Sequence, residues 1–556
     1  MTASRTDASR IHAWLAARTP WQRRGIAAAA GAAATLGHAP FFFVLLFVAA
    51  IVVLIWLLDG AAEKPNRIGR GFALGWWFGL GHMTTGLYWI TSAFNVDSTT
   101  WGPIWGIPAT LALAMVLGLF YGVGCALAMS LWTRDLRRLP WFAACLFASE
   151  WLRGNLVFGG FPWLLPGYVW TPGEPVSQLA SIVGIYGLSL LTLLMAAAVA
   201  AIADGGASAQ RRFAPTIVAA LLVGMGWGWG AQRLSRAPIE VPGALPVVRV
   251  ADSGLTQAEK WEGRPDQEWR VLARYVRASG DPNESDASIV IWPEGAIPTV
   301  NFFQLDNANY LAAVGRAMGD RVLITGLTRC EPQPVCDAFW QGRADVSQLQ
   351  LFNSAAIIDG VSGQARVSEQ VYDKHKLVPG GEYIPFWSVV SALNIAPLQR
   401  IGAGFERGEA PTRLIVPDAP PAVVLICYEA IFPRMTPRGE GRPGWIVSVT
   451  NDAWFGDLRW FTGPWQHYAM ARYRSIEEGL PMARAASGGV SAIVDSFGRE
   501  VRSTRDGDLA IEAQLPPALV ETTLARWGNI LLPLLVVFIA GLRFLPAGLL
   551  ARGRKS

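Results

Sequence analysis

The sequence predicts an α-helical membrane bundle of about eight transmembrane helices, joined to an exported α/β domain. The composition, the uneven placing of apolar residues and the positions of Lys and Arg lead to this prediction. Of the 556 residues, 52% are hydrophobic and 16% are charged, and the mean hydropathy is +0.30. This chain is too apolar for an ordinary soluble protein and too long for one compact domain.

Long apolar runs divide the chain. Residues 25–232 and 528–548 contain such runs with few charges, whereas residues 245–517 carry charges throughout and have strand-like runs bounded by Gly, Pro and Asp. A hydrocarbon core about 30 Å thick needs about 20 apolar residues per helix. We therefore predict eight spans, at residues 25–38, 40–58, 72–94, 104–132, 139–156, 177–203, 213–232 and 528–548.

The charges of the short connections give a topology, because Lys and Arg mark the cytoplasmic side. The connections 95–103 and 157–176 contain neither residue. Basic clusters lie at residues 5–24, 64–70, 134–138, 211–212 and 552–555. With eight spans all these clusters face the cytoplasm, whereas merging the first two spans would place the Arg-rich N-terminus outside. Arg233 and Arg236 lie just outside the membrane, which a long translocated domain tolerates.

Five parts follow from this topology. They are a cytoplasmic N-terminal segment (1–24), a seven-helix transmembrane domain (25–232), an exported domain (245–517), a C-terminal transmembrane helix (528–548) and a cytoplasmic tail (549–556). The net charge of +5 is mostly a topology signal. The exported domain has no basic stripe with interleaved aromatic residues, so we expect no nucleic-acid partner.

Three segments of the exported domain share one format, in which a run of strand-type residues ends at a polar residue. They are ASIVIWPEGAIP with Glu294, VYDKHKLVPGGEYIPF with Lys374 and Glu382, and AVVLICYEAIFP with Cys427. Near-continuous apolar runs predict strands covered on both faces. Functional residues of layered α/β folds collect at strand ends and on the loops beyond them.

Each of these four residues also has a structural interpretation. Cys427 could pack as a small hydrophobe, Glu294 could cap a helix, Lys374 could be a surface charge, and Glu382 could pair with a neighbouring base. Together they form a set suited to acyl transfer. A thiol has a reference pKa of about 8.5 and needs a base at neutral pH. A carboxylate can take its proton, and an ammonium with a backbone N–H near the thiol can stabilise an oxyanion.

The remaining cysteines and the histidines do not indicate a catalytic or metal site. Cys330 and Cys336 flank a Pro-rich loop, and we expect them to pair in an oxidising compartment. Cys125 and Cys145 lie within predicted spans and are expected to pack there. The histidines show no metal-ligand spacing, and no Gly-rich phosphate loop is present, so no metal or cofactor is expected.

The motifs WPEGAIP, YDKHKLVPGGEYIP and LICYE, in that order, resemble the Glu-Lys-Cys triad of the nitrilase superfamily. The membrane spans and the segments SEWLRG, GFPWLLPGY, VTNDAWFGD and GPWQHYAMARYRSIEEGLPMARAASGGVSAIVDSFG narrow the resemblance to the apolipoprotein N-acyltransferase family, over nearly the whole chain. The resemblance implies a nitrilase-like α-β-β-α sandwich for the exported domain. It also implies a bacterial inner-membrane location, with that domain in the periplasm and both termini in the cytoplasm.

By this resemblance Cys427 is the nucleophile, Glu294 the general base and Lys374 the oxyanion stabiliser. The further positions that it implies in support or in substrate binding are Glu382, Tyr428, Glu429, Trp261, Asn353 and Trp454.

The resemblance implies a ping-pong reaction. Cys427 takes the sn-1 acyl chain of a phospholipid, with phosphatidylethanolamine as the expected donor, and forms a thioester. The free α-amino group of a diacylglyceryl-cysteine lipoprotein then attacks the thioester. Residues 385–398 are apolar and follow the Lys374–Glu382 loop. They form either an amphipathic arm that dips into lipid or an ordinary core helix.

Two other functions compete with this one. A membrane-tethered nitrilase-type amide hydrolase would use the same triad with water as the acceptor. A transporter with a degenerate domain would use intramembrane charges such as Glu150 and Arg153 as a pathway. The transporter is disfavoured because these charges lie near the predicted outer membrane face, and because an inert domain has no need of all three triad residues.

Overall fold

The computed structural model divides into two compact units. The first comprises Met1–Thr91, Trp105–Arg236 and Trp527–Ser556, and the second Ser92–Ile104 and Ala237–Arg526. Within them the structure describes residues 7–96, 103–156, 159–204, 208–236, 245–260, 266–297, 308–341, 343, 349–361, 364–385, 387, 404–438, 441–504 and 508–544.

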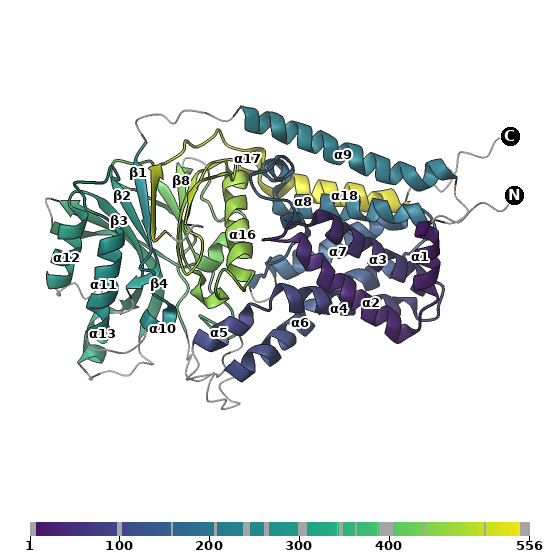
Figure 1. Cartoon of the computed structure of the whole chain (residues 1–556), viewed down its shortest axis with the longest axis horizontal. Coiled ribbons are helices and arrows are strands. Elements are labelled where there is room, and N and C mark those ends of the chain that lie inside the picture. The colour runs from purple at the N-terminus through teal and green to yellow at the C-terminus, as the bar shows by residue number, and fades with distance from the viewer. Residues whose placement is uncertain are drawn as a thin grey trace. The chain divides into compact units, whose positions relative to one another are not determined.

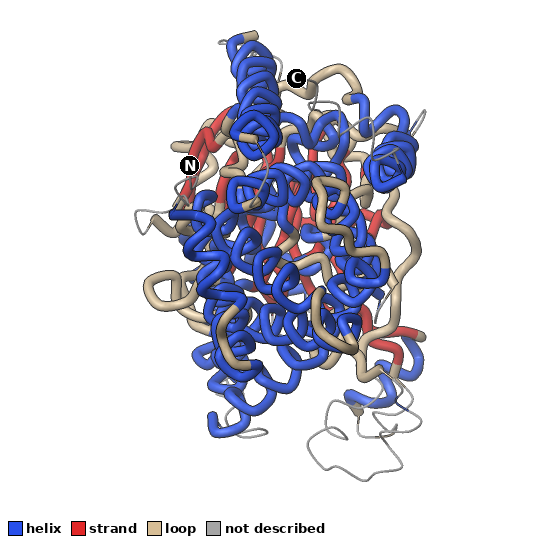
Figure 2. The backbone as a smooth tube through the Cα atoms, turned by 90° about the vertical axis from the view of Figure 1, so that its right-hand side faces the viewer, coloured by secondary structure: helices blue, strands red, loops and turns tan. Residues whose placement is uncertain are grey.

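The first unit is helical, and many of its helices are seen nearly along their axes in Figure 2. Its main helices are α1 Asp7–Ala16, α2 Pro20–Ala34, α3 Val44–Ala62, α4 Arg67–Gly86, α6 Gly106–Ser130, α7 Arg138–Asn155, α8 Ala180–Val199, α9 Ala209–Ser235 and α18 Leu531–Gly541. The capping box at Thr19, with Pro20 in the first turn, starts α2 five residues before the predicted span. Helix α1 lies in the segment that the sequence analysis assigned to no span.

Five helical segments of the described chain are long and apolar enough to cross a membrane. They are Val44–Ala62, Gly106–Ser130, Pro175–Ala203, Ala209–Ser235 and Thr523–Phe544. Helices α2, α4 and α7 occupy the other three predicted positions. Helix α2 has only 15 residues, and α4 begins with two arginines in its first four residues. Helix α7 begins with Arg138 and contains the Glu150–Arg153 ion pair. The apolar helices fit membrane segments, and the count of eight stays a prediction.

Glu150 and Arg153 form an ion pair inside the first unit. Their side chains are 1% and 0% exposed, and Arg153 Nη2 lies 2.5 Å from Glu150 Oε2. Arg153 Nη1 also donates to the carbonyl oxygens of Phe161 and Trp163, at 2.6 and 2.9 Å. The pair therefore holds the loop after α7, which is a structural use of these two charges.

The second unit contains two six-stranded sheets (Figure 1). The first has the order β12-β1-β2-β3-β4-β5 and the second the order β11-β10-β9-β8-β7-β6. The strands are β1 Val247–Ala251, β2 Ile289–Ile297, β3 Val322–Glu331, β4 Gln350–Val361, β5 Gln364–Asp373, β6 Arg413–Leu414, β7 Ala422–Ile426, β8 Trp445–Asn451, β9 Met482–Ser487, β10 Ala492–Val494, β11 Glu500–Ser503 and β12 Ala510–Gln514.

The central strands of both sheets are parallel and apolar. β1, β2 and β3 pair in parallel, as do β7, β8 and β9. Every residue of β7 and β8 is buried, because both faces of the sheet are covered. Val250, Ile291, Ile426 and Val447 belong to the core cluster shared by the two sheets.

Helices cover the outer faces of the sheets. α11 Gln267–Ala278 and α12 Ala308–Met318 place Leu272, Tyr275 and Val314 in a second core cluster with the first sheet. α16 Gly463–Glu478 lies beside the second sheet, on the side away from the first (Figure 1). These four layers form the nitrilase-like domain that the sequence analysis expected.

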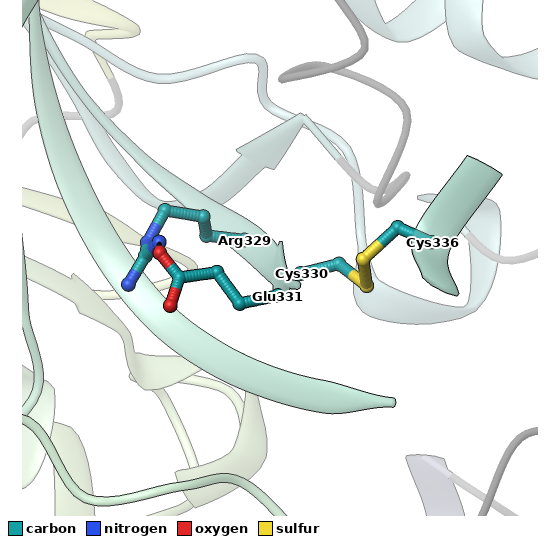
Figure 3. Close-up of a disulfide and its surroundings, with 4 residues drawn as sticks. All are labelled: Arg329, Cys330, Glu331 and Cys336. Carbon is teal, nitrogen blue, oxygen red and sulfur yellow. Dashed lines mark hydrogen bonds and ion pairs between the residues drawn. A yellow bond between two sulfur atoms is a disulfide. The ribbon is translucent and has the colours of Figure 1, made fainter. Parts of the chain in front are cut away.

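The expected disulfide between Cys330 and Cys336 is present, which confirms that prediction (Figure 3). Cys330 lies near the end of β3, and Cys336 lies in α13 Gln333–Trp340, so the bond ties this helix to the strand. Arg329 bonds to Glu331 at the same strand end. The other three cysteines are free and buried.

Candidate active site

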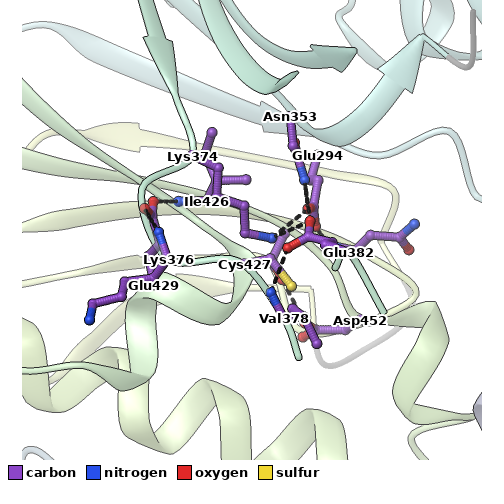
Figure 4. A network of polar contacts seen from close by, with 12 residues as sticks. Glu294, Asn353, Lys374, Lys376, Val378, Glu382, Ile426, Cys427, Glu429 and Asp452 are labelled. Atoms are coloured by element: carbon purple, nitrogen blue, oxygen red, sulfur yellow. Dashed lines mark hydrogen bonds and ion pairs between the residues drawn. The ribbon is translucent and has the colours of Figure 1, made fainter. Parts of the chain in front are cut away.

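The predicted triad lies within or just after strands of the second unit. Glu294 is in β2, Lys374 directly follows β5, and Cys427 directly follows β7. Asn353 is in β4. The structure brings the ends of these side chains together with Glu382, although the residues are far apart in the sequence (Figure 4).

Two carboxylates share one ammonium at the centre of the cluster. Lys374 Nζ lies 2.7 Å from Glu382 Oε1 and 3.3 Å from Glu294 Oε1, and the lysine side chain is 1% exposed. Burial alone would lower the pKa of Lys374, but Glu294 and Glu382 outweigh it and raise this pKa. Lys374 is therefore held as a buried cation.

Amide groups fix the two carboxylates. Asn353 Nδ2 donates to Glu294 Oε1 at 2.6 Å and to Glu382 Oε1 at 2.7 Å. The backbone N–H of Asn451 donates to the second oxygen of Glu294 at 2.9 Å, and that of Val378 to the second oxygen of Glu382 at 2.8 Å. Each carboxylate oxygen thus has a donor, which satisfies both buried acids.

Cys427 has a left-handed backbone, with φ of 48°, at the junction between β7 and the 3₁₀ turn η9 Cys427–Ile431. Such a conformation costs a non-Gly residue about 1–3 kcal/mol and occurs mostly at functional sites. Burial raises the pKa of the Cys427 thiol, Glu294 raises it further, and Lys374 opposes the shift. The thiol is therefore protonated at neutral pH, and the carboxylate of Glu294 lies near it (Figure 4).

Glu429 does not point at the thiol. Its Oε1 accepts hydrogen bonds from the Tyr372 hydroxyl at 2.7 Å and from the backbone N–H groups of His375 and Lys376 at 2.7 and 3.1 Å. Its Oε2 accepts from the backbone N–H of Ile426 at 2.8 Å. Burial raises the pKa of Glu429 to about 7. This side chain ties the loop after β5 to the end of β7.

The other predicted positions lie around this cluster or outside the described chain. Tyr428 is buried, with its ring in an edge contact with Phe432 at a centroid distance of 5.0 Å. Trp454 is half-buried in the 3₁₀ turn η11 Asp452–Phe455. Trp261 lies outside the described residues, as does nearly all of 385–398.

Three residues of the site were not predicted from the sequence. Asn451 and Asp452 stand at the end of β8, in VTNDAWFGD, and this strand end has the same format as the three that were singled out. His467, in α16, reaches the carbonyl oxygen of Cys427. No local pattern marks His467. Among the described residues no group of three His, Cys, Asp or Glu side chains could hold a metal ion.

Two family models match the chain. Residues 30–198 match the apolipoprotein N-acyltransferase N-terminal domain, and residues 249–523 match the carbon-nitrogen hydrolase family. Among solved structures, a glutamine-dependent NAD(+) synthetase from Cytophaga hutchinsonii covers 48% of this chain and 42% of its own at 10% identity. Its TM-score of 0.28 is too low to bear on the fold.

Relatives of known name match over most of their length. An apolipoprotein N-acyltransferase of Rhodopseudomonas palustris is 36% identical over 97% of this chain and 98% of its own. That of Bradyrhizobium diazoefficiens is 39% identical over 92% of each chain, and that of Brucella melitensis is 36% identical over 89% and 88%. The chain belongs to the apolipoprotein N-acyltransferase family.

Proposed function

We propose that this protein transfers the sn-1 acyl chain of a phospholipid, through a thioester on Cys427, to the α-amino group of a diacylglyceryl-cysteine lipoprotein. The observation that carries the proposal is the buried cluster in which Lys374 contacts Glu294 and Glu382 beside the thiol. Family membership supports lipoprotein N-acylation as the overall reaction. We take phosphatidylethanolamine as the donor.

In the first half-reaction Glu294 accepts the thiol proton while the sulfur of Cys427 attacks the ester carbonyl carbon. A C–S bond forms, and the carbonyl electrons move to oxygen. The ammonium of Lys374 and the backbone N–H of Tyr428 stabilise this oxyanion. When the intermediate collapses, the C–O bond to the glycerol breaks, and Glu294 returns its proton to the departing lysophospholipid oxygen.

The second half-reaction uses the same groups with an amine as the nucleophile. The neutral α-amino group attacks the thioester carbonyl, and Lys374 again faces the oxyanion. Glu294 takes a proton from the attacking nitrogen, the C–S bond breaks, and the proton passes to the sulfur of Cys427. Glu382 and Asn353 support the reaction by holding Lys374 and Glu294 in place.

We further propose that the chain crosses the inner membrane eight times, with both termini in the cytoplasm and the catalytic domain in the periplasm. The five apolar helical segments and the absence of Lys and Arg from connections 95–103 and 157–176 support this topology. An alkaline phosphatase fusion after residue 520 should be active, and one after residue 556 should be inactive. Equal activities would contradict the topology.

Mass spectrometry of the intact protein tests the chemistry. After incubation with phosphatidylethanolamine in detergent, the protein should gain the mass of one acyl chain, and Cys427→Ala should gain none. A lipopeptide with a free α-amino group should then remove the adduct and itself gain the acyl mass. An adduct that is absent, or equal in the Ala variant, would contradict the proposal.

The amide hydrolase is the second candidate, because residues 249–523 match the carbon-nitrogen hydrolase family. The same experiment separates the two functions. A transferase keeps its thioester until the amine arrives, whereas a hydrolase releases free fatty acid to water in the absence of the lipopeptide.

A further inference from the structure

His467 lies behind the nucleophile, on the side of its backbone carbonyl. The ring is fully buried, and its Nε2 lies 3.1 Å from the carbonyl oxygen of Cys427. Its Nδ1 lies 2.8 Å from Asp452 Oδ1. Because a carbonyl oxygen can only accept, the hydrogen of this contact is on Nε2 and His467 is the donor.

Asp452 holds this ring in its orientation. Its Oδ2 lies 2.7 Å from Arg484 Nη2, and its Oδ1 also accepts from the Thr450 hydroxyl at 2.9 Å. Burial would raise the pKa of Asp452, but Arg484 and His467 outweigh it and lower this pKa to about 2. Arg484 Nη2 is also 3.2 Å from His467 Nδ1. The carboxylate is the nearer partner of this nitrogen, and because a carboxylate can only accept, Nδ1 carries a hydrogen as well and donates to Asp452.

His467 is not placed to act as the general base. Both of its ring nitrogens are engaged, one by the Cys427 carbonyl and the other at the Asp452–Arg484 pair. The Phe455 ring contacts its edge at a centroid distance of 5.2 Å. The imidazole therefore acts on the backbone of Cys427.

The peptide group that accepts this hydrogen bond also carries the N–H that the proposed mechanism uses to stabilise the oxyanion. The carbonyl of Cys427 and the N–H of Tyr428 belong to the same peptide unit. A hydrogen bond to the carbonyl oxygen draws electron density toward that oxygen and makes the N–H a stronger donor, by about 10–30% per bond in condensed-phase estimates. The same bond restrains the left-handed backbone of Cys427.

We propose that His467 is a positioning residue that strengthens the oxyanion site. By donating to the Cys427 carbonyl, it polarises the peptide whose N–H stabilises the oxyanion in the proposed mechanism. This inference rests on the proposed function. Asp452 and Arg484 support the role of His467 by holding its ring in place.

Two substitutions test the role. His467→Leu removes the donor, whereas His467→Gln keeps an amide N–H near the position of Nε2. The rate of acyl-adduct formation on Cys427 from phosphatidylethanolamine should fall about tenfold to hundredfold in His467→Leu, since loss of a whole oxyanion donor costs about 10²–10³. His467→Gln should recover most of the rate. KM for the phospholipid should change little in either variant.

Alkylation of Cys427 by iodoacetamide separates polarisation from misfolding, because this displacement forms no oxyanion. Followed on the Cys427 peptide by mass spectrometry, the alkylation rate should stay within about twofold of wild type in His467→Leu. An equal fall in alkylation and acylation would mean that the thiol had moved, and would overturn the proposal. Unchanged acylation in His467→Leu would also overturn it.

The wild-type protein separates this inference from the proposed function. If wild type forms no acyl adduct, the acyl-transfer proposal itself fails. If wild type forms the adduct and His467→Leu forms it equally fast, the proposed function stands and the role of His467 is refuted.

Discussion

The carboxylate of Glu429 accepts a 2.7 Å hydrogen bond from the backbone N–H of His375, the residue that follows Lys374. Glu429, two positions after Cys427, thus holds the loop that carries Lys374, through donors on both sides. The geometry explains why a strand that ends in a thiol is followed so closely by a buried acid. Cys427 and Lys374 are anchored through one side chain.

Glu429→Leu removes this acceptor from four donors. Since a buried donor without a partner costs about 1–3 kcal/mol, we expect the free energy of unfolding to fall by roughly 3 kcal/mol or more. Glu429→Gln keeps one oxygen and should lose less. Melting temperatures in detergent measure the effect, with the exposed Glu284→Gln as a control. A Leu variant that melts like wild type would show that the carboxylate does not hold the loop.

Asn353→Asp replaces the donor between Glu294 and Glu382 with a third acid. At pH 7.5 we expect adduct formation on Cys427 to fall at least tenfold, because three carboxylates would then face one ammonium. Protonation of the new acid restores one donor, so the rate relative to wild type should recover at pH 5.5. Asn353→Leu should be slow at both pH values. Full activity of the Asp variant at pH 7.5 would contradict the bridging role.

Glu294→Gln should change the rates of two reactions of the Cys427 thiol, alkylation and acylation, in opposite directions. Burial and then Glu294 raise the pKa of Cys427, so removing the charge lowers this pKa and increases the thiolate fraction. Alkylation by iodoacetamide at pH 7.5 should therefore become faster. Acyl-adduct formation should become about 10²–10⁴-fold slower, because the general base is lost. A parallel change in both rates would exclude Glu294 as the base.

Glu478 makes the stability of the second unit depend on pH. Burial, and then Glu477, raise its pKa to about 7. The folded state thus binds the proton more tightly than the unfolded state, whose pKa is near 4.5. The stabilising contribution is complete below about pH 4.5 and is lost as the pH rises through 7. The pKa of Glu429 is also raised by burial, so its contribution to stability depends on pH in the same direction.

Glu478→Gln mimics the protonated acid at every pH. We expect it to stabilise the protein at pH 8 by on the order of 1–3 kcal/mol and to have little effect at pH 4.5. Thermal unfolding in detergent at the two pH values measures the difference. Greater stabilisation at the lower pH would reverse the sign and contradict the assignment.

Local patterns in the sequence predicted several of the residues that the structure brings together. Runs of strand-type residues before Glu294, Lys374 and Cys427 marked β2, β5 and β7, because strands covered on both faces are apolar, although β2 continues past Glu294 to Ile297. The Cys330–Cys336 disulfide was also predictable from a local pattern, since the two cysteines are only six positions apart. Five of the eight predicted spans coincide with helical segments long and apolar enough to cross a membrane, whereas polar residues in α4 and α7 and the shortness of α2 weaken the apolar signal at the other three.

Only the tertiary structure decided which groups face one another. No local pattern indicates that Glu429 turns away from the thiol, or that His467 donates to the Cys427 carbonyl, because these contacts join residues from different elements. Because β9, β8 and β7 are neighbours in the sheet, Arg484 in β9 comes close to Asp452, which follows β8, and Cys427 follows the next strand, β7. Residue type and burial are encoded locally, whereas hydrogen-bond partners depend on strand order and register, which long-range packing determines.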